Sequence, residues 1–287
     1  MLPRNSTSQI LSAFASLNIF PPNGDQNSDG IEFSYPNYWQ ACALRQLKGH
    51  GLTSEMLLNR NDGGHEFNER HYFALLNLVK LSMFNIHDAL REIEGLSPAQ
   101  AGGIEAGLTR EDVIQLKNFW HIDALRELKL CGLTSRILLS RNDGGHEFDI
   151  NHSFALCRLV EDKGFNIHAA LKEIEGLSSI QARGIDDGLA RQDVLLLENI
   201  WHINALEKLK RRGLTSEMLL IRNEGGHKFD QEHYYALINL VEEKKFNIQD
   251  ALKEIEGVSS DQAKMIRNGQ SLIAKMDDYS PNRSLRF

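Results

Sequence analysis

The sequence GLTSEMLLNRNDGGHEF at residues 51–67 decides the fold, because it returns twice further along the chain. It reads GLTSRILLSRNDGGHEF at 132–148 and GLTSEMLLIRNEGGHKF at 213–229, so each copy starts 81 residues after the previous one. A second phrase, FNIHDALREIEG at 84–95, recurs with the same spacing. A fixed period without insertions is typical of repeat proteins, in which each unit buries its apolar face against its neighbours.

Each 81-residue unit divides into two related halves of about 40 residues. The phrases NIHAALKEIEGLSS (166–179) and HINALEKLKRRGLTS (202–216) both contain Ala-Leu and are closed by Gly and Leu-Ser/Thr. Helical repeats of this length stack because a single unit cannot bury its apolar stripe. We therefore predict an all-α fold, a right- or left-handed solenoid of about 40-residue half-repeats.

Capping signals predict three helices in the first half of each unit. Thr53 and Ser54 precede a short apolar run, and the Asp-Gly-Gly that follows ends it. Asn68 precedes a second helix, whose apolar residues follow the 3–4 spacing of one buried stripe. Asn85 precedes a third, which Gly95 closes.

In the second half, Ser97 and Pro98 start a helix that ends at Gly107. We expect one long helix to follow, from the capping pair of Thr109 and Asp112 through Leu128. This helix carries Trp120, which recurs as Trp39 and Trp201. At helical spacing beside leucines, we interpret these tryptophans as buried core rather than as stacking platforms for bases.

The composition restricts the class of partner and the compartment. The 287 residues carry a net charge of -7, which argues against a phosphate-seeking surface as the global character. Three cysteines at unrelated repeat positions (Cys42, Cys131 and Cys157) indicate free thiols in a reducing compartment. The start is a poor secretory signal and no apolar run is long enough for a bilayer. We expect a protein without a membrane segment that is cytoplasmic or injected into a host cell.

Composition also sets the expected boundaries. Residues 1–35, rich in Ser, Asn, Pro and Gly, are interpreted as a flexible segment or degenerate cap, and 276–287 as a loose tail. The helical repeat domain is expected at 36–275, with repeats near 39–119, 120–200 and 201–275.

The phrase LTSEMLLNRNDGG at 52–64 resembles the opening of the DNA-reading repeats of transcription activator-like effectors. Those repeats pair a short helix with a loop ending in Gly-Gly, followed by a longer helix. The overall style also resembles helical-repeat effectors that bacteria secrete into host cells. The resemblance implies that the two residues before the loop glycine face nucleic acid. In the second halves these dyads are Glu105-Ala106, Asp186-Asp187 and Arg267-Asn268.

The module lengths and loops depart from that family. Its repeats are uniform in length, whereas the halves here alternate, and the second-half loops lack Gly-Gly. The polar or basic residues that follow Gly-Gly in the family are replaced by His65-Glu66 and His146-Glu147. These departures weaken the expectation of DNA reading.

The main candidate binding surface is a ridge formed by the recurring Arg-Asn-Asp/Glu-Gly-Gly-His. In a solenoid, equivalent loops line up on one edge. The same residue types also cap and turn loops, so a purely structural role is the favoured alternative. The ridge consists of Arg60, Asn61, Asp62, His65, Arg141, Asn142, Asp143, His146, Arg222, Asn223, Glu224 and His227.

No catalytic or metal-binding motif emerges from the sequence. His65 and His71 are six residues apart, which is not the spacing that places two ligands on one helical face. We therefore expect structural histidines, no cofactor and no metal. The predicted function is a non-enzymatic recognition scaffold with a protein partner. A nucleic-acid-binding repeat protein is the alternative, and an enzyme with a composite site between repeats is third.

Overall fold

A computed structural model describes residues 38–61, 63–221 and 228–270 of the chain. Within them every regular element is a helix and no strand occurs, which confirms the all-α prediction. The predicted segment 1–35 and the tail 276–287 lie outside the described residues.

The helix that carries Trp39, α2 (Tyr38–Leu47), precedes the first unit, which contains six α-helices. Those of its first half are α3 (Ser54–Leu58), α4 (Glu69–Lys80) and α5 (Ile86–Ile93). Those of its second half are α6 (Pro98–Glu105), α7 (Arg110–Val113) and α8 (Phe119–Leu128).

The same order of helices returns further along the chain. The second unit contains α9 (Ser135–Leu139), α10 (Ile150–Glu161), α11 (Ile167–Ile174), α12 (Ser179–Asp186), α13 (Arg191–Val194) and α14 (Ile200–Leu209). The third contains α15 (Ser216–Ile221), α16 (Gln231–Ile238), a turn of π-helix (Asn239–Glu243), α17 (Ile248–Ile255) and α18 (Ser260–Arg267).

The predicted caps begin the helices. The Thr53 hydroxyl accepts from the Met56 N–H at 3.3 Å at the start of α3. Asn68 accepts from two backbone N–H groups at the start of α4, and Asn85 accepts from the Asp88 N–H at 3.0 Å. These bonds satisfy donors that a helix start leaves without an intrahelical partner.

The expected long helix of the second half is wrong, because the structure has two helices, α7 and α8, separated by residues 114–118. The Leu116 N–H bonds back to the Val113 carbonyl at 2.9 Å, which closes α7. Asn118 then caps α8, its side chain accepting from the Trp120 N–H at 2.8 Å. Its amide group also donates to the Phe148 carbonyl at 2.6 Å, so a contact from the next unit fixes the break.

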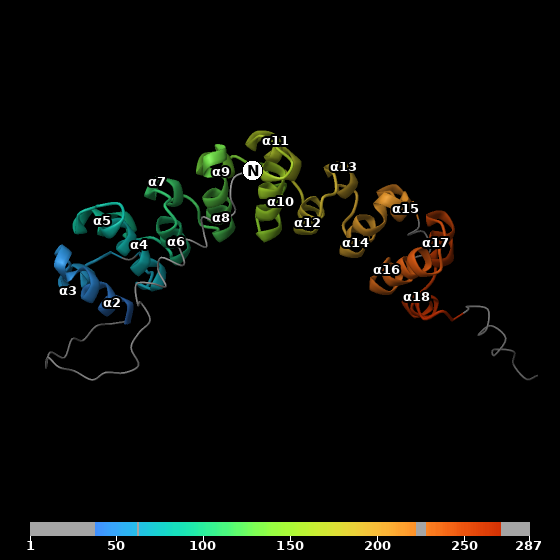
Figure 1. The fold of residues 1–287 in the computed structure, drawn as a ribbon, viewed down its shortest axis with the longest axis horizontal. Helices are drawn as coiled ribbons and strands as arrows, with labels where there is room; N and C mark the ends of the chain where they lie inside the picture. Colours follow the sequence, from blue (N-terminus) through green and yellow to red (C-terminus); the bar gives the residue numbers. More distant parts are fainter. Residues whose placement is uncertain (1–37, 62, 222–227, 271–287) are drawn as a thin grey trace, which may run out of the picture. The chain divides into compact units, whose positions relative to one another are not determined.

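Eight helices, called here the long helices of the array, pack in a row in which each contacts the next. α6 lies between α4 and α8, α8 lies on α10, and the row continues through α12, α14 and α16 to α18 (Figure 1). Helices α5, α11 and α17 lie outside this row and pack beside α4, α10 and α16. Leucines, isoleucines and alanines from all of these helices form one continuous buried core.

The three tryptophans are only half-buried, whereas the sequence pattern predicted that they are part of the buried core. Each packs against the margin of the core from the first turn of α2, α8 or α14. The Trp39 ring lies 5.7 Å from that of Tyr72, and Trp201 lies 5.7 Å from Tyr234, between ring centroids. Their large rings cover the core edge and keep one side at the surface.

Close packing of α6 on its neighbours depends on Gly103. A Cβ atom there would meet Val113 Cγ1 at 2.8 Å and Ile122 Cγ2 at 2.9 Å, both too close. Gly184 is in the same position against Val194 in the second unit. Met265 stands at this position in α18.

Candidate binding surfaces

In the second unit, the arginine of the predicted ridge is buried and bonded to other residues of the chain. The Arg141 side chain is only 2% exposed and forms an ion pair with Asp143. It donates to the Ile174 carbonyl at 3.3 Å, and its guanidinium carbon lies 4.9 Å from the Phe148 ring centroid. Arg60 lies over Phe67 at the same distance. Cation–π packing and burial tie these guanidinium groups to the fold.

The asparagine of the ridge holds the loop in shape. The Asn61 side chain accepts from the Gly63 N–H at 3.2 Å, and the backbone N–H of Asn61 donates to the Glu94 carboxylate at 3.2 Å. Asn142 makes the same two bonds with Gly144 and Glu175. Such local turns are a common role of asparagine.

His65 and His146 are exposed, as are Asn61 and Asn142. The ridge as a binding surface stays a prediction for these described residues. Asp62, Arg222, Asn223, Glu224 and His227 lie outside the described residues.

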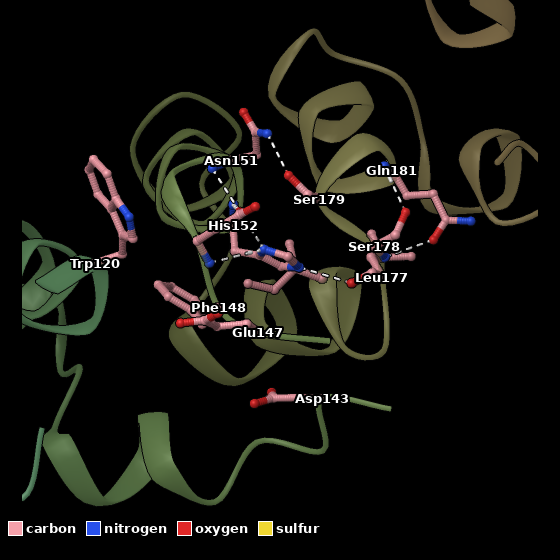
Figure 2. A network of polar contacts seen from close by, with 12 residues as sticks. Trp120, Asp143, Glu147, Phe148, Asn151, His152, Leu177, Ser178, Ser179 and Gln181 are labelled. Atoms are coloured by element: carbon pink, nitrogen blue, oxygen red, sulfur yellow. Dashed lines mark hydrogen bonds and ion pairs between the residues drawn. The ribbon is translucent and has the colours of Figure 1, made fainter. Parts of the chain in front are cut away.

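One buried histidine in each of α4, α10 and α16 contacts the backbone just before the helix that begins the next half. Figure 2 shows the histidine of α10, His152. His152 Nε2 donates to the Leu177 carbonyl at 2.9 Å, and its Nδ1 lies 2.7 Å from the Asp149 carboxylate and 3.3 Å from the Asp149 backbone nitrogen. His71 contacts Leu96 O in the same way at 2.8 Å. A carbonyl can only accept, so Nε2 carries a proton. The structural interpretation is confirmed for these histidines and for His233, which contacts Val258 O at 2.9 Å.

A second layer of histidines is packed on the core phenylalanines. His121 stacks on Phe148 with 4.6 Å between ring centroids, and His202 lies 4.8 Å from Phe229. Burial lowers the pKa of His121, with a further contribution from the Arg141 charge. Burial alone lowers the pKa of His202 to about 4, so this ring is neutral at physiological pH.

The second-half loop dyads are also engaged within the chain. Glu105 accepts from Arg70 at 2.9 Å, and Asp187 pairs with Arg183 at 3.6 Å. Burial raises the pKa of Asp186, and the nearby Arg158 charge opposes that rise. Arg267 pairs with Glu232 at 3.1 Å and lies 4.7 Å from the Tyr235 ring centroid. Ala106 and Asn268 end their helices at exposed positions.

The ion pair between α4 and α6 is reversed in the third unit. Arg70 on α4 pairs with Glu105 on α6, whereas Glu232 on α16 pairs with Arg267 on α18. Each residue lies 162 positions from its counterpart, two full periods. Opposite charges are therefore kept although the identity of each residue has changed.

Comparing the three copies separates two surfaces. Residues of the ridge and of α5, α11 and α17 are nearly the same in every copy. Half-exposed and exposed positions on the long helices differ, as in the triplet Arg70, Asn151 and Glu232 and the triplet Gly102, Arg183 and Lys264. We call the exposed side of α4, α6, α8, α10, α12, α14, α16 and α18 the variable face. Both surfaces contain internal bonds, but only the variable face differs in side chains from copy to copy.

One polar residue of the core escaped the sequence interpretation. Gln100 completes a capping box with Ser97 and donates to the Val113 and Ile114 carbonyls, both at 3.1 Å. Gln181 repeats this with the Leu195 carbonyl at 3.0 Å. The signal was its presence in all three copies, at a position three residues after Ser.

Comparison with protein families, curated proteins and solved structures finds no match to this chain. Within the described ranges, no helix has the length and apolar character needed to cross a membrane. The same part of the chain contains no group of three or more His, Cys, Asp or Glu side chains suited to a metal ion.

Proposed function

We propose that this chain is a solenoid of helical half-repeats that acts as a non-enzymatic scaffold and binds a protein through its variable face. Contacts that link each long helix to the next, and the recurrence of the helices with the sequence period, support the solenoid. Such arrays offer extended surfaces for macromolecular partners.

The contrast between a constant core and a variable face carries this proposal. Leu75, Leu156 and Leu237 are identical and fully buried, while a more exposed position five residues earlier in the same helices holds Arg70, Asn151 or Glu232. Side chains that differ between copies on a common framework provide different contacts along the array. That is the arrangement by which repeat scaffolds achieve specificity.

The charges of the variable face favour protein over nucleic acid. Four of its arginines are paired with acids, in the pairs Arg70–Glu105, Arg126–Asp123, Arg183–Asp187 and Arg267–Glu232. Nucleic-acid binding gains most of its affinity when cations neutralise phosphates, and paired arginines serve that purpose poorly. Exposed Phe119, Phe154 and Tyr235 among mixed charges are typical of protein interfaces instead.

Two parallel selections test this proposal. The full chain is immobilised and exposed to a displayed library of short random peptides and, separately, to randomised duplex DNA at physiological salt. We expect a peptide consensus and no DNA consensus. Exchange of Glu105, Asp186 and Arg267 for alanine serves to locate any selected ligand. A defined DNA sequence that is lost in this variant would contradict the proposal.

DNA reading is the second candidate, and the exposure of Asn61 and Asn142 at the loop tips favours it. The resemblance to transcription activator-like effector repeats places the base-reading dyads at these loops. The same resemblance suggests a secreted bacterial effector that acts in a host cell. The DNA arm of the selection decides between the two candidates.

A further inference from the structure

The first and last helices of the described array carry apolar side chains that are only partly covered. In the described part of the chain no helix precedes α2 and none follows α18. Ala41 and Leu44 of α2 are partly exposed, whereas Ile122 and Leu125 are buried at the same positions of α8. Met265 of α18 is also partly exposed. The end units of repeat arrays usually have a polar outer face, so these apolar side chains indicate a surface for association.

Inside the array, one junction recurs between neighbouring long helices. Gly103 of α6 receives Ile122 of α8, because a Cβ atom on the glycine would lie only 2.9 Å from Ile122 Cγ2. Gly184 of α12 receives Ile203 of α14, whose Cγ2 and Cδ1 atoms would both lie 3.3 Å from such a Cβ atom. In both junctions the small residue is on the earlier helix and the large residue is on the later one.

At the two ends of the array the sizes are exchanged. α18 has Met265 where α6 and α12 have glycine, and α2 has Ala41 where α8 and α14 have isoleucine. Neither change alone suits the junction found inside the chain, since methionine would overlap isoleucine and alanine would leave a void against glycine. Together the two changes are complementary, because a methionine side chain fills the space that an alanine leaves. The α18 end of one molecule therefore fits the α2 end of another.

Gln262 adds a hydrogen-bond donor to the α18 end. Its counterparts Gln100 and Gln181 are buried, and their amide groups donate to carbonyls at the end of the helix that follows. The Gln262 side chain is exposed, and its oxygen accepts from the Ser259 N–H at 2.7 Å as in the other copies. Its amide nitrogen makes no hydrogen bond within the described residues. The end of α18 thus keeps the donor that joins one half-repeat to the next inside the chain.

We infer that copies of this chain associate head to tail, with the α18 end of one copy packed on α2 of the next. Met265 of the first copy lies against Ala41 of the second, in the register that Gly103 and Ile122 have within one chain. The two surfaces differ, so each copy binds one neighbour at each end and the array continues from chain to chain. This assembly goes beyond the protein partner proposed for the variable face and does not depend on it.

Side-chain volume, and not charge, selects the second copy. By the register of the pocket in the first unit, Arg45 of one copy comes near both Glu232 and Lys264 of the other, which gives one attraction and one repulsion. The net charge of -7 on each copy also opposes association slightly. Since the contact involves only the end helices, we expect weak association, with a Kd on the order of tens of micromolar.

Sedimentation equilibrium of the full chain tests the association. We expect the weight-average mass to rise with concentration between about 10 and 300 µM and to pass the mass of a dimer, because head-to-tail contacts do not close after two copies. A chain that stays monomeric up to about 300 µM, or whose mass levels off at the dimer, would overturn the inference.

Exchange of the two side chains tests the location. Ala41→Ile sets isoleucine against Met265, and Met265→Gly leaves a void against Ala41, so each change alone should weaken association at least about fivefold. The double variant recreates the pair of Gly103 and Ile122 and should return to within about threefold of the parent. Such recovery excludes damaged folding as the cause of the single effects, since the double variant contains both changes. Effects that simply multiply in the double variant would contradict the contact.

A mixture of two blocked chains tests the head-to-tail orientation. Ala41→Glu blocks the α2 end and Met265→Glu blocks the α18 end, so each variant alone should be monomeric at about 100 µM. Each keeps the end that the other has lost, and an equimolar mixture should therefore form dimers and nothing larger.

Circular dichroism and thermal unfolding check that the blocked chains fold, and Ala41→Lys or Met265→Lys replaces a variant that does not. Association of either blocked chain alone, or a mixture without dimers, would overturn the inference. In that case the two ends are covered by other segments of the same chain, and Met265 only closes the core at the end of the array.

Discussion

At the scale of single residues, two adjacent glycines of α6 have opposite surroundings. A Cβ atom on Gly103 would lie 2.8 Å from Val113 Cγ1, whereas one on Gly102 would lie 3.5 Å from Arg70 Cδ. We expect Gly103→Ala to lower the free energy of unfolding by about 1–3 kcal/mol through overpacking. Gly102→Ala should be neutral or raise it by up to about 1 kcal/mol, because alanine favours the helix.

Urea unfolding of both variants measures these free energies. The change in the midpoint should have opposite signs for the two glycines, or be near zero for Gly102→Ala. Equal midpoints would show that the helices adjust freely around α6, contrary to the close packing described for Gly103.

His202 makes the stability depend on pH. Its pKa is lowered by burial to about 4 in the folded chain, against about 6.5 when unfolded. As pH falls below about 6.5, the unfolded chain binds a proton that the folded chain does not, so stability falls until about pH 4. The loss from this residue is at most about 3 kcal/mol.

His202→Gln copies Gln40, the residue at the same position two periods earlier, and removes the titrating imidazole. We expect the free energy of unfolding of the variant to fall less than that of the parent between about pH 6.5 and pH 4.5. His87→Gln, which copies Gln249 at an exposed position, is the control. A parallel pH dependence of parent and His202→Gln would contradict the assignment.

At the scale of helices, the reversed ion pair allows a charge-swap experiment. Arg70→Glu and Glu105→Arg each place like charges between α4 and α6, while the double variant recreates the pair of Glu232 and Arg267. Because the pair is partly exposed, each single change should cost no more than about 1 kcal/mol, and the double variant should recover about half or more of the summed cost. A double-mutant cycle from thermal unfolding measures the coupling, and additive effects would contradict it.

Helix starts were predictable from the sequence because a cap acts over three residues. Asn68, Asn85 and Ser97 bond to backbone groups two or three positions away, so the information is local. The break at residues 114–118 was missed because Asn118 is also held by the Phe148 carbonyl, 30 residues further on. Long-range contacts of this kind are not visible in a local pattern.

The candidate site was harder to predict than the helices. The repeat marked the Arg-Asn-acid loops, but whether Arg141 is exposed depends on its packing over Phe148 and on the carbonyl of Ile174. The pocket lined by Arg70 of α4, Gly102 of α6 and Phe119 of α8 depends on how these three helices lie together. Sequence similarity between copies therefore identifies shared structure, whereas their differences mark the face through which we propose that the chain binds a partner.

At the scale of the whole molecule, an array with contacts between neighbouring helices should tolerate loss of a complete unit. Deleting residues 120–200 joins Phe119 to Trp201 and brings α14 to the position of α8, where Ile203 replaces Ile122 beside Gly103. We expect a cooperatively folded chain with the same helicity per residue and a lower unfolding midpoint, since one set of interfaces is lost.

Circular dichroism and urea unfolding of the deletion variant check this expectation. Deletion of residues 110–190 is the control, because it removes the same number of residues with a different boundary and joins the end of the α6 segment to the start of α13. This variant should also fold, because it keeps the register of the repeat. An unfolded 120–200 deletion would mean that the units depend on contacts beyond their neighbours, and would contradict the solenoid.

The reversed ion pair also affects how the chain finds its fold. Copies with the same buried leucines and alanines invite misassembly, because α4 meets on α18 the same apolar surface that it meets on α6. That wrong pairing sets Arg70 against Arg267, and the opposite error sets Glu232 against Glu105. Like charges disfavour both products. The reversed charges therefore distinguish the first copy from the third during folding, while the residues that build the core remain the same.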